Sequence, residues 1–133
     1  MLYHVLAVGD VVSEPGLRQL ERHLRPLQKL KNISFTVVNG ENAAAVGLLP
    51  EHAAGADVVT LGNHTFGKQQ IAPYLDDVAW LLRPANFTGR APGRGCGIYD
   101  LGAVRIRVVN LIGRCGLSWG ADNPFTTVDK LLG

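Results

Sequence analysis

Short apolar runs alternate along this chain with amphipathic segments. Four of the apolar runs have the length of a strand; they cover residues 3–8, 33–38, 57–61 and 79–82. Because most of its positions are apolar, the first run is expected to be a buried strand. Strands that alternate with helices indicate a parallel sheet with right-handed crossovers, and therefore an α/β fold.

The clearest helix signal is a set of leucines three or four residues apart, with basic side chains on the other face. The leucines are Leu17, Leu20, Leu24, Leu27 and Leu30, and the basic residues are Arg18, Arg22, Arg25 and Lys29. Pro26 is expected to kink or end this helix, because proline lacks an amide proton and its ring clashes with the preceding turn. We interpret the basic stripe as a solvated face rather than a binding surface.

Weaker signals predict the remaining helices. A turn or two of helix is expected at residues 50–54, and a short helix at residues 68–75. Asn123 followed by Pro124 indicates the start of a last helix, because asparagine caps a helix and proline favours its first position.

A hairpin is predicted around Gly102, between residues 98–101 and 104–111. In its second strand Arg105 and Arg107 are expected to face outward, with the intervening apolar residues facing inward. The end of this strand, at residues 108–112, is apolar on both faces, which predicts burial on both sides. A face of this kind marks an interface, so we expect a homo-oligomer.

Composition limits the class of protein. The chain has 133 residues, which is the size of one domain, and its net charge is +2. With 47% hydrophobic and 18% charged residues it is neither disordered nor basic enough to indicate a general nucleic-acid or membrane-surface protein. No run approaches the ~18 apolar residues of a membrane span. Cys96 and Cys115 form no CxxC pair, which predicts free thiols and a cytoplasmic location.

Polar side chains follow three successive predicted strands, each time after a glycine. The segments are Gly9-Asp10, Gly40-Glu41-Asn42 and Gly62-Asn63-His64. Because ligands bind beyond the carboxyl ends of parallel strands, these side chains are expected to share one crevice. Taken singly, each has a simpler interpretation: Asp10 can cap the next helix, Glu41 and Asn42 can bond backbone amides, and His64 can be a surface histidine.

Taken together, the same side chains predict metal-dependent phosphoryl chemistry. Two neighbouring carboxylates repel each other unless a cation or proton neutralises them. Carboxylate, carboxamide and imidazole donors suit Mn²⁺, Fe or Zn²⁺, with Mg²⁺ less favoured. Glu41, on the middle loop, is the natural bridge between two metal ions. Asn63 can bind a metal through its carbonyl oxygen, and His64 can protonate a leaving alkoxide.

The motifs resemble those of calcineurin-like metallophosphoesterases, and within them the bacterial YmdB-like family. The segments that carry the resemblance are residues 8–12, 38–44, 60–65, 82–86 and 92–95, and the likeness extends to residues 123–125. The resemblance implies an α/β fold with two packed β-sheets flanked by helices. It also implies hydrolysis of 2′,3′-cyclic nucleotides or related phosphodiesters by attack of a metal-bound hydroxide.

The resemblance assigns a role to each candidate residue. Asp10, Glu41 and Asn63 are implied to bind divalent or trivalent metal ions, Fe or Mn in preference to Zn or Mg, with Glu41 bridging the two ions of the family's site. Asn42 is implied to hold the substrate phosphate, and His64 is implied to be the general acid.

The chain also departs from the family pattern. The family's second half supplies further histidine ligands, whereas no histidine follows His64 here. We therefore expect residues 1–133 to be the N-terminal half of the family's domain, and the isolated half to have activity near background. The rival hypothesis is a non-catalytic module that keeps the fold and serves in assembly or RNA contact.

A second candidate site is the arginine-rich stretch at residues 83–114, which contains six arginines and a single acidic residue, Asp100. The glycine-rich turn at residues 89–97 lies within it and could form a phosphate-binding nest of amides. We favour the alternative, a turn that leads into a strand with solvated arginines around it.

Overall fold

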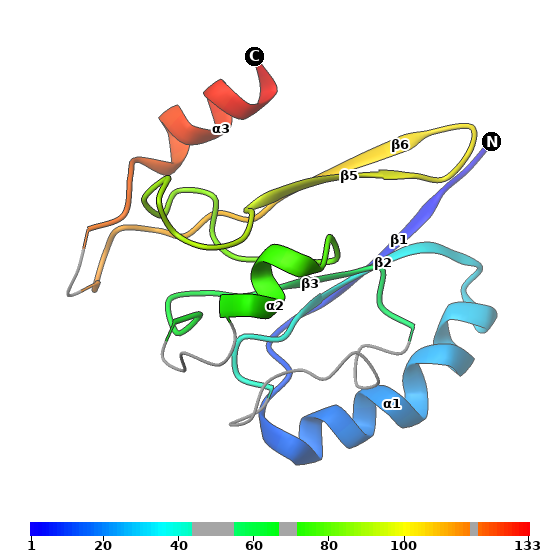
Figure 1. The fold of residues 1–133 in the computed structure, drawn as a ribbon. Helices are drawn as coiled ribbons and strands as arrows, with labels where there is room; N and C mark the ends of the chain where they lie inside the picture. Colours follow the sequence, from blue (N-terminus) through cyan, green and yellow to red (C-terminus); the bar gives the residue numbers. More distant parts are fainter. Residues whose placement is uncertain (44–54, 67–71, 118–119) are drawn as a thin grey trace. The chain divides into compact units, whose positions relative to one another are not determined.

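The computed structural model describes residues 1–43, 55–66, 72–117 and 120–133. The chain forms two compact units, Met1–Thr60 and Leu61–Gly133. The elements of the first unit are β1 (His4–Val8), α1 (Ser13–Leu30), β2 (Ile33–Asn39) and β3 (Val58–Thr60) (Figure 1). The elements of the second are α2 (Ala72–Asp77), β4 (Leu81–Leu82), β5 (Cys96–Asp100), β6 (Arg105–Val109) and α3 (Pro124–Leu132). The helical turn expected at residues 50–54, and the start of the helix expected at 68–75, lie outside the described residues.

The first unit contains the predicted parallel sheet. β1 and β3 both pair with β2 in parallel, with Val8 opposite Val38 and Val38 opposite Val59. Because the strands run in the same direction, their carboxyl ends meet at one edge, as the sequence predicted. Leu17 of α1 belongs with Val38 to a buried apolar cluster that fixes the helix on the sheet.

β1 is more exposed than predicted. Val5 is 56% exposed, and no residue of β1 is fully buried. Within the described part of the first unit, β1 has a neighbour on one side only and forms the edge of the sheet. The expectation of a buried strand is therefore wrong, because an apolar run does not reveal how many neighbours the strand has.

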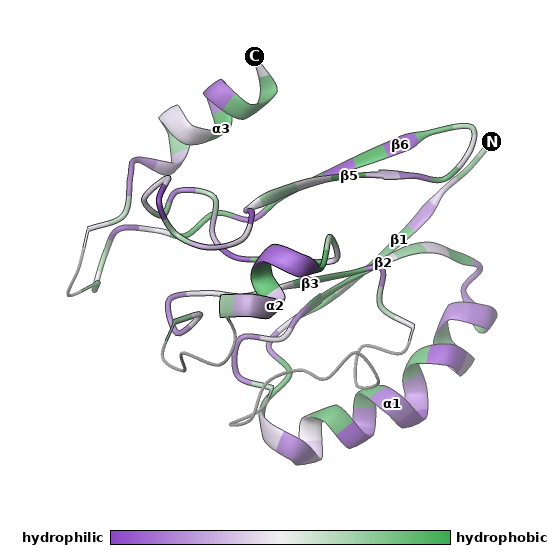
Figure 2. Cartoon of the chain, viewed as in Figure 1, coloured by the Kyte–Doolittle hydropathy of each residue, from purple (hydrophilic) through white to green (hydrophobic). Residues whose placement is uncertain are grey.

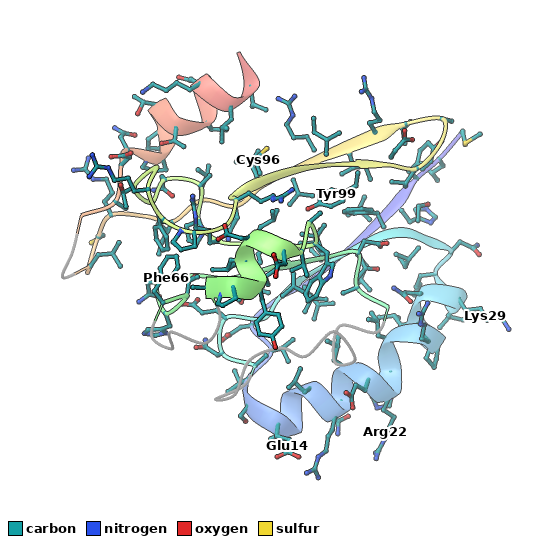
Figure 3. The ribbon with its side chains drawn as sticks, in the orientation of Figure 1. Glu14, Arg22, Lys29, Phe66, Cys96 and Tyr99 are labelled. Carbon is teal, nitrogen blue, oxygen red and sulfur yellow. The ribbon has the colours of Figure 1, made fainter. Side chains whose placement is uncertain are left out.

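α1 confirms the predicted amphipathic helix, with a difference at Pro26. The helix continues through Pro26 to Leu30, so the proline does not end it. Because Pro26 has no amide proton, the backbone carbonyl of Arg22 has no helical hydrogen-bond donor. Arg22 is exposed, so water can donate to that carbonyl instead. The basic side chains of α1 are solvated, as predicted: Figure 3 shows Arg22 and Lys29 extending away from the sheet, and Figure 2 shows hydrophilic positions along the helix.

The second unit contains the predicted hairpin and the predicted last helix. β5 and β6 are antiparallel, and Gly102 in the turn between them has a φ of 91°. Arg105 and Arg107 are exposed, as expected from the alternation. Asn123 caps α3, since its Oδ1 accepts a hydrogen bond of 2.9 Å from the amide of Phe125.

The apolar end of β6 and the two cysteines were also subjects of prediction. The apolar residues at 108–112 are half-buried within the single chain, and the association expected to cover them stays a prediction. Both cysteines are free, as predicted.

In the part of the chain that the structure describes, no helix is long and apolar enough to cross a membrane.

A buried asparagine holds the middle of the second unit together. The amide of Asn86 donates to the carbonyls of Ile112 (2.8 Å) and Asp122 (2.9 Å), and its Oδ1 accepts from the amide of Ile112 (2.9 Å). Such a saturated buried polar group fixes one arrangement of the segments it joins, because leaving any partner unpaired costs about 1–3 kcal/mol.

Candidate functional site

The loops that follow β1 and β2 lie side by side in the first unit. The amide of Val11 donates to the carbonyl of Asn39 (3.1 Å), and the amide of Ser13 donates to the carbonyl of Asn42 (2.7 Å). These two hydrogen bonds extend the contact between the strands beyond their ends. The parallel register therefore positions the loop that carries Asp10 against the loop that carries Glu41 and Asn42.

Asp10 and Asn42 are in direct contact across these loops. The Nδ2 of Asn42 donates a hydrogen bond of 2.8 Å to the Oδ1 of Asp10. Asp10 has a φ of 34°, in the left-handed region that non-glycine residues adopt rarely and at a cost of about 1–3 kcal/mol. The N-cap of α1 is Val12, with no side-chain cap bond, so the interpretation of Asp10 as the helix cap is wrong.

Glu41 is fixed by a tight turn at the end of β2. Its amide donates to the Oδ1 of Asn39 (3.2 Å), and the amide of Ala43 donates to the carbonyl of Gly40 (3.1 Å). The amide of Gly40 in turn donates to the carbonyl of Thr60 (2.9 Å), at the end of β3. Glu41 is half-buried in this turn, on the loop adjacent to the one that carries Asp10.

Asn63 and His64 belong to the second unit, in a turn that follows β3 along the chain. The backbone amide of Thr65 donates to the carbonyl of Gly62 (3.2 Å), and the Thr65 hydroxyl donates to the same oxygen (2.5 Å). Thr65 is buried, whereas Asn63 and His64 are exposed. The turn is anchored through its threonine and presents the asparagine and the histidine at the surface.

An apolar cavity of about 540 Å³ lies beside this turn, and Asn63 and His64 form part of its wall. Phe66 and Phe87 contribute the aromatic part, with ring centroids 5.8 Å apart and ring planes inclined by 43°. The sequence interpretation missed both phenylalanines. The position of Phe66 two residues after His64 was the available signal, whereas Phe87 belongs to no motif or periodic pattern that marks a site.

The donors of the first unit fit part of a metal site in their chemistry. Asp10 and Glu41 are carboxylates on adjacent loops. The hydrogen bond from the side-chain amide of Asn42 orients the carboxylate of Asp10, as hydrogen-bonding partners of metal ligands usually do. Among the described residues no group of three or more His, Cys, Asp and Glu side chains lies close enough to hold a metal ion. The predicted ligands Asp10 and Glu41 therefore lie on adjacent loops of the first unit, whereas Asn63 belongs to the second unit.

The glycine-rich turn at residues 89–97 is organised from inside by Arg83. This side chain is 6% exposed and donates to the carbonyls of Ala91 (3.2 Å), Pro92 (2.9 Å) and Gly93 (3.3 Å). Burial lowers the pKa of the Arg83 guanidinium, and the charge of Asp76 opposes that shift. Three carbonyls of the turn bond this cation, which favours the structural interpretation over the phosphate nest. The expectation of solvated arginines is confirmed for Arg90 and Arg94 but is wrong for Arg83, which is buried.

The chain is similar to several known proteins over nearly all of its length. The chain is 39% identical over 134 residues to the 2′,3′-cyclic-nucleotide 2′-phosphodiesterase of Bacillus subtilis (strain 168), a match that covers 96% of this chain and 50% of the relative. Among solved structures, a protein from Thermus thermophilus matches with a TM-score of 0.85 and 34% identity, over 96% of this chain and 52% of that one. A phosphatase from Mycoplasma pneumoniae matches with a TM-score of 0.84 and 28% identity, over 98% of this chain and 50% of that one.

The chain therefore spans about half the length of the relatives it matches. The structural matches support the predicted α/β fold, since they include a phosphatase and cover nearly all of this chain. The sequence model of the family described as "YmdB-like protein" matches residues 6–133, and the chain belongs to that family.

Proposed function

We propose that this chain supplies part of the active site of a metal-dependent phosphodiesterase that hydrolyses 2′,3′-cyclic nucleotides or related phosphodiesters. The observation that carries the proposal is the hydrogen bond between Asn42 and Asp10. It joins a carboxylate, which can bind a metal ion, to a carboxamide, which can bind a phosphate, at the carboxyl edge of the sheet. The Bacillus subtilis relative, named as a 2′,3′-cyclic-nucleotide 2′-phosphodiesterase, supports the choice of substrate.

Asp10 and Glu41 would hold metal through their carboxylate oxygens, and Asn63 through its side-chain carbonyl oxygen. These three ligands offer oxygen atoms, which suit manganese. The resemblance to the family adds iron as the other favoured ion, ahead of zinc or magnesium. Bound at this site, such ions would stabilise the negative charge that develops on the phosphoryl oxygens. The strained backbone of Asp10 is consistent with such a role, because unfavourable φ values persist mainly where function requires them.

Asn42 would contact both the metal-binding carboxylate of Asp10 and the phosphate of the substrate. Its amide nitrogen carries two protons, and one of them bonds to Asp10 and fixes the orientation of that carboxylate. The other proton can donate to a phosphate oxygen of the substrate. A single side chain would thus align the substrate with the carboxylate that holds the metal.

His64 would donate the proton that the leaving oxygen requires. In a 2′,3′-cyclic phosphate, hydrolysis breaks a bond between phosphorus and a ribose oxygen, and that oxygen leaves as an alkoxide unless it is protonated. The exposed position of His64, on a turn anchored by Thr65, allows it to reach a substrate in the neighbouring cavity.

The test uses this chain co-expressed with the part of the Bacillus subtilis relative that it does not match. Hydrolysis of 2′,3′-cyclic AMP in the presence of Mn²⁺ is followed by ³¹P NMR. We expect turnover by the co-purified complex, activity near background for the chain alone, and a loss of about 10²–10⁴ in turnover for His64→Ala with metal content retained. His23→Ala, at an exposed histidine of α1, is the matched control. A complex that forms but does not hydrolyse the substrate, or a His64→Ala complex with unchanged turnover, contradicts the proposal.

A further inference from the structure

The side chain of Asn110, which directly follows β6, holds two other segments of the second unit together. Its Nδ2 donates to the carbonyl of Leu61 (2.7 Å) and to the carbonyl of Leu82 (3.0 Å), the last residue of β4. The backbone amide of Leu61 donates to the same Leu82 oxygen (2.9 Å). A carboxamide nitrogen carries two protons, and both are used here, so the three segments are fixed in one arrangement.

The bond to Leu61 fixes the point at which the turn of Asn63 and His64 begins. The Leu61 carbonyl belongs to the peptide plane that leads into Gly62, and a planar peptide moves as one body. Gly62 would otherwise allow a wide range of backbone angles, because glycine has no Cβ. The other end of the turn is anchored by Thr65, which donates to the carbonyl of Gly62. The direction in which His64 leaves the buried segment therefore depends on the bond to Leu61.

The position of Asn110 is itself fixed by its backbone. Its amide donates to the carbonyl of Gly95 (2.9 Å), and its carbonyl accepts from the amide of Ala85 (2.7 Å). Leu82, the second acceptor of the side chain, is fully buried and precedes the segment that ends at Phe87, in the wall of the cavity. The side chain of Asn110 therefore holds the histidine-bearing turn in register with one wall of that cavity.

We propose that Asn110 is a positioning residue for the proton transfer from His64, and that it acts by holding the turn in the orientation that the transfer requires. The inference rests on the proposed function for the role of His64 and adds to it the residue that orients this side chain. A proton is transferred efficiently only within hydrogen-bond reach, about 2.6–3.2 Å between heavy atoms. A misplacement of about 1 Å can cost about 10²-fold in rate. A turn that gains freedom at its first peptide loses this alignment.

Two phosphodiesters with different leaving groups test the proposal in the co-purified complex. 2′,3′-cyclic AMP releases a ribose alkoxide, which needs a proton, whereas bis(p-nitrophenyl) phosphate releases a nitrophenolate that is stable without one. We expect Asn110→Ala to lower kcat for 2′,3′-cyclic AMP by about 10²-fold and to leave kcat for the nitrophenyl ester unchanged, with KM unchanged for both. Equal losses on both substrates, or no loss on either, would show that Asn110 serves only the fold, and the proposal would be overturned.

Two further variants separate positioning from a general loss of stability. Tyr99→Phe is the matched control, because it removes a hydrogen bond of 2.7 Å to the carbonyl of Ala79 elsewhere in the second unit. It should leave the ratio of the two rates unchanged. Asn110→Leu keeps a side chain of similar volume without a donor and should reproduce the effect of Asn110→Ala. If circular dichroism shows both Asn110 variants to be unfolded, the residue belongs to the fold rather than to the site, and the proposal is overturned.

A measurement on the isotope-labelled chain alone distinguishes this inference from the proposed function. ¹⁵N relaxation gives the order parameters of the backbone amides of Asn63 and His64, which are about 0.85 for rigid backbone and below about 0.6 for flexible backbone. We expect Asn110→Ala to lower them from the first value toward the second, and Tyr99→Phe to leave them unchanged. Lowered order parameters together with a complex that hydrolyses neither substrate refute the proposed function alone. Order parameters that Asn110→Ala leaves unchanged refute the positioning role alone.

Discussion

The side chain of Asn42 donates a 2.8 Å hydrogen bond to the carboxylate of Asp10, which is 32 residues earlier in the chain. The bond joins the loops after β1 and β2, and the backbone bond from Ser13 to the carbonyl of Asn42 reinforces the connection. The carboxylate of Asp10 is therefore oriented before any ligand binds. Preorganisation of this kind raises the affinity of a metal site, because less freedom is lost on binding.

Removing the Asn42 amide should weaken metal binding without unfolding the chain. Asn42→Ala keeps the backbone carbonyl that accepts from Ser13 and, among the contacts of the described residues, loses the bond to Asp10. We expect the Kd for Mn²⁺ to rise about 10-fold to 100-fold, the usual effect of removing a partner of a metal ligand. Mn²⁺ titration followed by electron paramagnetic resonance measures it. Gln19→Ala, at an exposed amide of α1, should have no effect, and equal affinity in Asn42→Ala and the parent chain would show that the bond does not orient a ligand.

A methyl group at Gly95 should destabilise the second unit. An added Cβ would overlap the backbone of Ala85, which cannot move aside as a flexible side chain could. Overpacking of this kind costs about 1–3 kcal/mol and occasionally more. Gly95→Ala should accordingly unfold at a lower concentration of urea than Gly89→Ala, where the added methyl group has open space. Equal midpoints for the two variants would refute the close packing of Gly95 on Ala85.

Tyr99 should make the stability of the chain sensitive to alkaline pH. Burial raises the pKa of its hydroxyl above the ordinary value, and the positive charge of Arg94 offsets part of that rise. The folded state therefore holds the proton more tightly than the unfolded state. The free energy of unfolding should be unaffected by this group below a pH of about 10 and should fall as the pH rises above it, through the pKa of the folded state.

Urea denaturation between neutral and alkaline pH tests this expectation. Tyr99→Phe should lower stability at neutral pH by about 0.5–1.5 kcal/mol, because it loses the hydrogen bond of 2.7 Å to the carbonyl of Ala79. It should also reduce the alkaline loss of stability. Tyr74→Phe, at an exposed tyrosine of α2, serves as the control. A Tyr99→Phe chain that loses stability with pH as steeply as the parent would assign that loss to other groups.

Features with a local signal could be predicted from the sequence. The spacing of the leucines predicted α1, the apolar runs predicted β1 to β3, and the Asn123–Pro124 pair predicted the start of α3. The parallel order of these strands followed from the helix between them, and it placed Asp10 and Glu41 on adjacent loops. Local patterns suffice here because each depends only on residues a few positions apart.

Features that depend on distant partners could not be predicted. The exposure of Val5 is set by the position of β1 at the edge of the sheet. The contact between the rings of Phe66 and Phe87 joins residues that are far apart in the sequence. The bond between Asn42 and Asp10, and the left-handed backbone of Asp10, likewise need the register of two strands. The sequence marks candidate residues for the chemistry, but it does not reveal the contacts between their side chains.

The most direct test of the central claim is the metal content of the chain, measured by elemental analysis after loading with Mn²⁺ and exhaustive dialysis, together with a Mn²⁺ titration. Because Asp10 and Glu41 provide only part of a coordination sphere, we expect at most one weakly bound ion per chain, whose affinity falls in Asp10→Ala and in Glu41→Ala but not in Asp129→Ala, an exposed aspartate of α3. Two ions retained per chain, or a Mn²⁺ affinity that none of these substitutions changes, would contradict the account.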